Sequence, residues 1–114
     1  MMVEQLLQQV RNQPDTVEFD QVIEVIDAHY RFTPTAFYNG EVYNPRGANE
    51  GSCKLLAFAQ LHQLGELETL ALFGRYYRDD VLGHPGGSDH ANIRNFLLDG
   101  WLGVRFEGEP LHPV

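Results

Sequence analysis

The sequence predicts a small α+β protein: one mostly helical domain of about five helices, one β-hairpin and a candidate C-terminal strand. Apolar residues recur at helical spacing over most of the chain. That period is lost over residues 31–52, where an Asn-Gly pair lies between aromatic and β-branched residues. The length of 114 residues is close to the commonest domain size, so we expect a single domain spanning residues 1–114.

Two helices are expected in the first quarter of the chain. Their apolar stripes consist of Val3, Leu6, Leu7 and Val10, and of Phe19, Val22, Ile23, Ile26 and Tyr30. Pro14 ends the first helix because its ring cannot continue the helical hydrogen bonds. Asp15, followed three residues later by Glu18, resembles a capping box for the second. So short a connection predicts a helical hairpin.

The middle of the chain predicts a hairpin followed by a buried helix. Asn39-Gly40 is the strongest hairpin signal, and it predicts a type I′ turn with both residues at positive φ. Ser52 is the expected N-cap of the third helix, and Gly65 is its expected C-cap. Apolar residues cover a wide arc of this helix, so we expect it to lie at the centre of the core.

Two more helices and an extended end are expected after residue 65. Residues 67–77 continue the helical period, and the glycine-rich run 83–87 interrupts it. Ser88 is the expected cap of the fifth helix, and Gly100 its expected end. Residues 101–106 are then typical of a strand, and the tail to residue 114 of an extended segment.

Charge excludes several classes of partner. The formal net charge is −8, which repels nucleic acids and anionic membrane surfaces. Residues 31–64 carry +1, so this segment is where a small anion would be tolerated. The longest apolar stretches are too short to span a bilayer. The single cysteine fits a reducing compartment, and the N-terminal segment does not resemble a secretory signal peptide. We therefore expect a cytoplasmic protein.

Several long segments, in order, resemble one protein family. They read FYNGEVYNPRGANEGSCKLLAFAQL, ETLALFGRYYRDDVL, HPGGSDHANIRNFLLDGW and GVRF, and the chain is similar over nearly its whole length to the HopJ (HopPmaJ) family. The resemblance implies a type III effector, delivered by bacteria into host cells, with no assigned activity. A folded first helix without serine among its first fifteen residues is atypical of a type III export signal. Cytoplasmic residence therefore stays our expectation, with export as the alternative.

Cys53 is the candidate catalytic nucleophile. A thiol at the start of a helix is favoured as thiolate by the helix dipole. His84 or His90, and then Asn92, follow in the order used by papain-like enzymes. The flanking residues do not match the papain signature, and a small apolar Cys at the start of a core helix explains the position equally well.

The glycine-rich turn before the fifth helix is a candidate anion site. Ser88 and Asp89 lie where that helix should start, and Arg94 follows one turn later. His84, Asp89 and His90 are also candidate metal ligands, with Glu50 or Cys53 completing the set. They lack the spacing of a known metal motif, so we expect no metal and no cofactor.

An asparagine-rich loop is the second candidate binding region. Its candidate residues are Asn39, Asn49, Glu50 and Ser52, although asparagines beside glycine often serve only the turns themselves. We expect the loops 44–52 and 83–89 to lie together, because both precede helices of one core.

These patterns favour a protein that acts by binding a partner protein or a small molecule, and they establish no catalysis. One alternative is a small Cys-dependent hydrolase or transferase that uses Cys53 with His84 or His90. Another is a cytoplasmic housekeeping protein of the same family. Apolar residues on the first helix would allow a homo-oligomer, although the core needs the same stripe.

Overall fold

The computed structural model describes residues 1–114 and contains five α-helices among short strands. The α-helices are α1 (Val3–Asn12), α2 (Phe19–His29), α3 (Glu50–Leu61), α4 (Glu66–Ala71) and α5 (Ala91–Asp99). The strands are β1 (Tyr30–Phe32), β2 (Phe37–Asn39), β3 (Val42–Asn44), β4 (Val104–Phe106) and β5 (Leu111–Pro113). Short helical turns η1 (Pro14–Thr16), η2 (Tyr76–Val81) and η3 (Gly100–Gly103) complete the chain. The predicted α+β class is confirmed.

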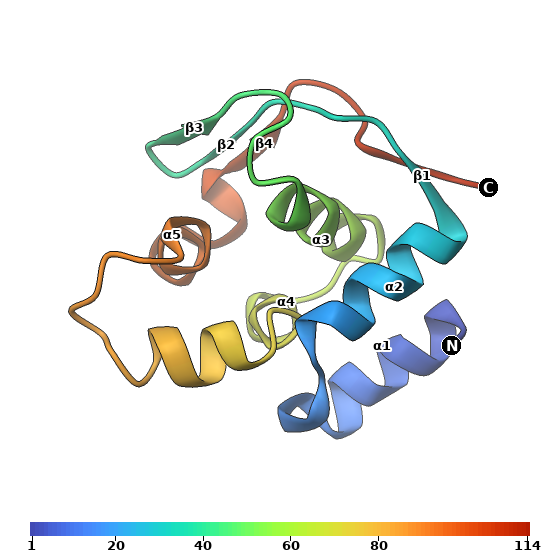
Figure 1. The fold of residues 1–114 in the computed structure, drawn as a ribbon, viewed down its shortest axis with the longest axis horizontal. Helices are drawn as coiled ribbons and strands as arrows, with labels where there is room; N and C mark the ends of the chain where they lie inside the picture. Colours follow the sequence, from blue (N-terminus) through green and yellow to red (C-terminus); the bar gives the residue numbers. More distant parts are fainter.

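The strands form one long antiparallel ribbon with a hairpin at one end. β1 pairs with β5, and β2 pairs with β4, in the same residue register. Backbone hydrogen bonds from Thr33 to Pro110 and from Glu107 to Ala36 continue that register through the gap. β3 pairs with the other side of β2. The segment 30–39 therefore runs beside 104–113 along its whole length, and the ribbon arches over the helices in Figure 1.

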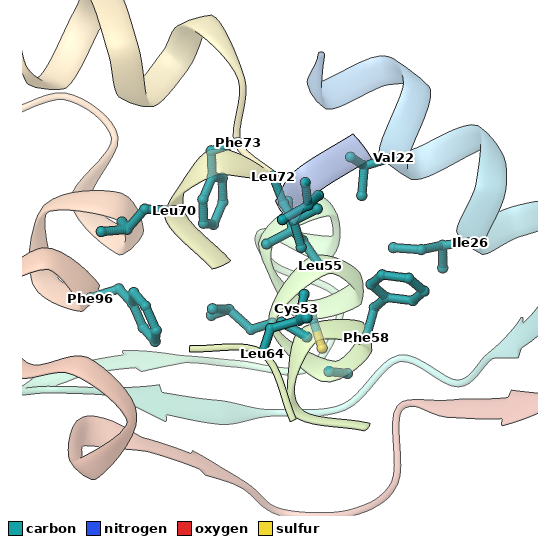
Figure 2. Packing of buried hydrophobic residues seen from close by; sticks show 14 of the residues in the cluster. Val22, Ile26, Cys53, Leu55, Phe58, Leu64, Leu70, Leu72, Phe73 and Phe96 are labelled. Atoms are coloured by element: carbon teal, nitrogen blue, oxygen red, sulfur yellow. The ribbon is translucent and has the colours of Figure 1, made fainter. Parts of the chain in front are cut away.

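Helix α3 lies between the strands and the other helices (Figure 1). Six of its residues are buried: Cys53, Leu55, Leu56, Ala57, Phe58 and Ala59. Figure 2 shows Phe58 and Leu55 facing Ile26 of α2 and Leu72, the residue that follows α4. The expectation of a central third helix is confirmed. Burial of each large side chain stabilises the fold by about 1.5–3 kcal/mol.

The hairpin turn differs from the predicted one. Asn39 pairs with Val42, so the two-residue loop is Gly40-Glu41 rather than Asn39-Gly40. Gly40 has φ +64°, whereas Glu41 is not at positive φ, which is the pattern of a type II′ turn. Asn39 therefore belongs to strand β2 and not to the loop, and its residue is buried, at 0% exposure.

Three predicted helix boundaries are also wrong. Helix α3 starts at Glu50 rather than after Ser52, and Gly65 precedes α4 instead of ending α3. The predicted helix 67–77 is broken at Gly74, which has φ +63° and approaches the backbone of residues 17–19 too closely for a side chain. A π-helical turn, η2, follows it.

The last part of the chain follows the prediction more closely. The fifth helix starts at Ala91 instead of directly after Ser88, and it ends at Gly100, at φ +62°, as expected. Strand β4 occupies only the second half of the predicted 101–106 strand. None of the helices is long and apolar enough to span a bilayer.

Candidate ligand-binding site

The first turns of α3 and α5 line one cavity of about 390 Å³. The wall is completed by residues of α2, β3 and the segment after α4. The lining residues are Phe19, Val42, Asn49, Gly51, Ser52, Phe73, Tyr76, His90, Ala91, Asn92 and Ile93. We expected the loops 44–52 and 83–89 to lie together. The first loop contributes Asn49, Gly51 and Ser52 to the cavity, but the second contributes no residue, and residues 90–93 take its place.

Both helix starts have an unusual backbone conformation. The cap residues Asn49 and His90 are left-handed, with φ, ψ of 53°, 47° and 52°, 51°. Non-glycine residues adopt this region rarely, and an N-cap is normally extended. Neither helix has a side-chain cap. The Asn49 amide instead donates to Asn44 Oδ1 at 2.7 Å, and the His90 ring bonds Asp80 Oδ2 at 3.0 Å.

The uncapped starts leave backbone donors without an acceptor in the protein. The first backbone hydrogen bonds run from Cys53 to the Asn49 carbonyl, and from Arg94 to the His90 carbonyl. The N–H groups of residues 50–52 and 91–93 precede these bonds and have no intrahelical partner. Such groups carry the positive end of the helix dipole, and of these residues Gly51, Ser52, Ala91, Asn92 and Ile93 line the cavity. Helix starts of this kind suit an anionic or carbonyl oxygen.

Asn44 on β3 connects the two helix starts. Its Oδ1 accepts from Asn49 at 2.7 Å and from Asn92 Nδ2 at 2.9 Å. Its Nδ2 donates to Asn92 Oδ1 at 3.2 Å and to the Phe37 carbonyl at 3.4 Å. Asn44 and Asn92 are both buried. A buried amide needs hydrogen-bond partners, so this network sets the distance between the first turns of α3 and α5.

Asn39 supports the same network from β2. Its Nδ2 donates to the Asn92 carbonyl at 2.8 Å and to Asn92 Oδ1 at 3.0 Å, while its own carbonyl accepts from Asn95. Its Oδ1 is buried without a hydrogen-bond partner. The asparagines therefore do more than shape turns: they join two strands to the first turn of α5.

Aromatic rings form the other half of the cavity. The Phe19 and Phe73 rings stack at 6.3 Å and 11°, and Tyr76 packs edge-on against Phe19 at 5.4 Å. The Tyr76 ring also lies 5.2 Å from the His90 ring. Gly51 is required at this point, because a β-carbon there would lie 2.8 Å from the tip of the Phe19 ring. The cavity is thus polar on its helix-start side and apolar on the other.

Cys53 belongs to the core rather than to the cavity. Its residue is 1% exposed, and its Sγ donates to the Thr35 carbonyl at 3.5 Å. Figure 2 places the sulfur among apolar side chains that include Phe58 and Leu64. Burial raises the pKa of the thiol to about 11. A nucleophilic thiolate needs the opposite shift, so the hypothesis of an activated Cys53 is not supported.

The proposed partners of Cys53 are also engaged elsewhere. His90 is paired with Asp80, the Asn92 amide serves the asparagine network, and His84 lies in the exposed loop outside the cavity. No group of three or more His, Cys, Asp or Glu side chains is arranged to hold a metal ion.

The sequence identified part of the cavity. Among the candidate binding residues, Asn49 and Ser52 line it, and Asn39 bonds the lining residue Asn92. Arg94 does not line it and bonds the adjacent loop instead. Glu50 lies at the start of α3 outside the lining, and Ser88 and Asp89 lie in the exposed loop. The aromatic wall was missed: Phe19, Phe73 and Tyr76. Their spacing is that of ordinary core positions in separate helices. Gly51 was the one sequence signal for the close contact between the start of α3 and Phe19.

The fold and the site define a small α+β protein with a ligand-sized cavity between two uncapped helix starts. The model of the HopJ type III effector protein family matches residues 3–111, and the chain belongs to that family. It is similar to a solved structure described as the crystal structure of unknown function protein VPA0580. The identity is 46%, the TM-score is 0.98, and the match covers 100% of this chain and 95% of that one. No curated protein matches the sequence.

Proposed function

We propose that this HopJ-family protein acts by binding a small ligand in the cavity between the starts of α3 and α5. The ligand has one anionic or carbonyl oxygen group and an apolar, preferably aromatic, body. The observation that carries the proposal is that both helix starts are left uncapped by left-handed residues and line the same cavity. A volume of about 390 Å³ lies in the range of small-molecule sites.

Backbone donors, rather than a basic side chain, account for the proposed anion preference. Helix N-termini bind carboxylates and phosphates through free N–H groups and the helix dipole. The nearby Arg94 is fully used by Asp89 and by backbone carbonyls. Asp80 and Asp89 stand close to His90. The balance therefore favours a group with a single negative charge over one with several.

A binding role fits the chain better than Cys-dependent catalysis does. The only thiol is in the core with a raised pKa, whereas the cavity itself contains amides, backbone donors and aromatic rings. These groups orient a ligand. We therefore retain the binding hypothesis and do not propose the hydrolase.

The proposal is tested by titrating the ¹⁵N-labelled protein with benzoate while recording amide shifts. We expect saturable shifts at residues 50–52 and 91–93. Ala91→Asp places a carboxylate at the exposed first position of α5 and should weaken benzoate binding at least about tenfold. The neutral control Ala91→Asn should bind like the wild type.

Stability separates loss of the site from loss of the fold. An acid in the first turn interacts favourably with the helix dipole, so Ala91→Asp should raise the free energy of unfolding by about 0.3–1 kcal/mol. Absence of saturable shifts at both helix starts in the wild type, or equal benzoate affinity in the Asp and Asn variants, would contradict the proposal.

We also propose that the folded protein works in the cytoplasm in which it is made. Helix α1 buries Leu6, Leu7 and Val10 in the core, and export through a type III apparatus requires that this helix unfold. A translocation reporter fused to the C-terminus measures delivery into host cells. No signal above that of a non-exported cytoplasmic protein supports residence, and an apparatus-dependent signal contradicts it.

A further inference from the structure

We propose that Arg94 keeps the cavity open by holding the Asp89 carboxylate away from the start of α5. Arg94 is thus a positioning residue, and the inference rests on the proposed function. Asp89 immediately precedes the left-handed His90. If it were free, Asp89 would be among the preferred capping residues for this helix.

The guanidinium group of Arg94 makes four hydrogen bonds to the preceding loop. Nε donates to the Asp89 carbonyl at 2.6 Å, and Nη1 donates to the His84 carbonyl at 2.8 Å. Nη2 donates to Asp89 Oδ1 at 2.6 Å and to the Asp80 carbonyl at 3.3 Å. One side chain, only 14% exposed, therefore ties η2 and the loop 82–89 to the second turn of α5.

Two further observations show that the loop is built around this group. Gly87 leaves room for it, because a β-carbon there would lie 2.6 Å from Nη2. The hydrogen bond from Arg94 also lowers the pKa of Asp89, so the carboxylate stays ionised and bonded to Arg94. Asp89 is otherwise exposed, and its carboxylate contacts only Arg94 and, at 3.8 Å, the His90 ring.

Release of Asp89 would close the site by ordinary capping chemistry. His90 would move from the left-handed to the right-handed helical region and become the first residue of a longer helix. Asp89 would then be the N-cap, and its carboxylate would accept from the N–H groups of Ala91 or Asn92. The N–H groups of Ala91 and Asn92 would then no longer be free to bind a ligand. A strong cap is thus present in the sequence but diverted by Arg94.

The test compares Arg94→Gln with Arg94→Gln/Asp89→Ala, using Arg75→Gln as the control. Arg75 is an exposed arginine whose ion pair is with Glu18. In the absence of ligand, Arg94→Gln should shift the His90 carbon resonances to helical values and slow amide exchange at residues 91–92. Its benzoate affinity should fall roughly fivefold to tenfold, the equivalent of one competing cap. Removal of the competitor in the double variant should restore fast exchange and the affinity.

The outcomes separate this proposal from the previous one. If the wild type does not bind benzoate, the proposed function fails, while the His90 resonances still report whether Arg94 sets the backbone. Unchanged His90 resonances in Arg94→Gln overturn the role of Arg94, as does a double variant that behaves like the single one. Should Arg94→Gln not fold, Arg94→Lys replaces it in both variants, because lysine lacks the planar fork with which Nε and Nη2 hold the Asp89 carbonyl and carboxylate together. The same shift and the same recovery are then expected.

Discussion

The helices of this protein start in two different ways. At α1, α2 and α4 a side chain three residues into the helix accepts from the backbone of an extended cap residue: Gln5 from Met2 at 2.8 Å, Gln21 from Glu18 at 3.3 Å and Glu68 from Gly65 at 3.0 Å. At α3 and α5 the cap residue is left-handed, and no side chain caps the helix. In the first three starts a side chain satisfies the N–H of the cap residue, although none of the five α-helices has a side-chain cap on its first turn. The last two starts lack this returning side chain, and they line one cavity.

The starts of α3 and α5 are locally less stable than the other three helix starts. A side chain that accepts from the N–H of the cap residue contributes up to about 1 kcal/mol, and a left-handed non-glycine residue has a cost of its own. The chain accepts both losses at the two helices that share a cavity. Departures from local rules of this kind concentrate at functional sites, so the contrast itself marks the cavity.

The substitution expected to change stability most removes Asn44, which connects the starts of α3 and α5. Asn44→Ala leaves the amides of Asn49 and Asn92 without their shared partner inside the protein. We expect a loss of about 2–4 kcal/mol in the free energy of unfolding. The control Asn95→Ala removes a single, partly buried bond to Asn39 and should cost about 1 kcal/mol. Urea denaturation measures both, and equal losses would mean that Asn44 is not the hub of the network.

The second prediction concerns two neighbouring residues of α3. Ser52 lines the cavity, whereas Cys53 is in the core and should make stability depend on pH. The pKa of the Cys53 thiol is about 11 in the folded protein, against about 8.5 in an unfolded chain. The unfolded state therefore ionises first, and stability should fall as the pH rises from about 8.5 towards 11. Cys53→Ala should remove this part of the pH dependence. In the wild type at pH 8, alkylation of the thiol should require unfolding; rapid alkylation of the folded protein would show an exposed thiolate instead.

The smallest expected changes in stability come from one substitution at the start of α4 and one at the start of α3. Glu68→Ala removes the side chain that returns to the start of α4 and should cost about 1 kcal/mol, whereas Glu68→Gln keeps the hydrogen bond and should cost less. Ser52→Ala should change stability by less than about 0.5 kcal/mol, because no side chain caps α3. Thermal unfolding monitored by circular dichroism resolves these differences. A loss from Ser52→Ala as large as that from Glu68→Ala would remove the distinction between the two kinds of start.

The sequence predicted the features that depend on local pattern. Apolar spacing located the helices, the width of the apolar arc identified α3 as central, and Gly100 correctly ended α5. The features it missed depend on residues far apart in the chain. Asn49 is left-handed because its amide is bonded to the network, and Gly74 breaks a helical pattern because the backbone near residue 18 lies against it.

The candidate site was predicted in outline for the same reason. Asparagine and glycine clusters identified Asn49 and Ser52 as binding candidates. His90 and Asn92 were selected only as catalytic partners of Cys53, and the aromatic wall was missed. Strand β1 and the ribbon of 30–39 with 104–113 also escaped prediction. Their pairing joins the middle of the chain to its end, and short runs of three residues carry little strand signal of their own.

The starts of α3 and α5 are proposed to hold one oxygen group of a ligand together. A crystal structure of the protein with 4-bromobenzoate shows whether they do, because anomalous scattering locates the bromine and the density orients the carboxylate. We expect the carboxylate within hydrogen-bonding distance of backbone nitrogens from both α3 and α5, with the bromine toward Phe19 and Tyr76. A carboxylate directed at the aromatic wall, or a compound bound only outside this cavity, would contradict it.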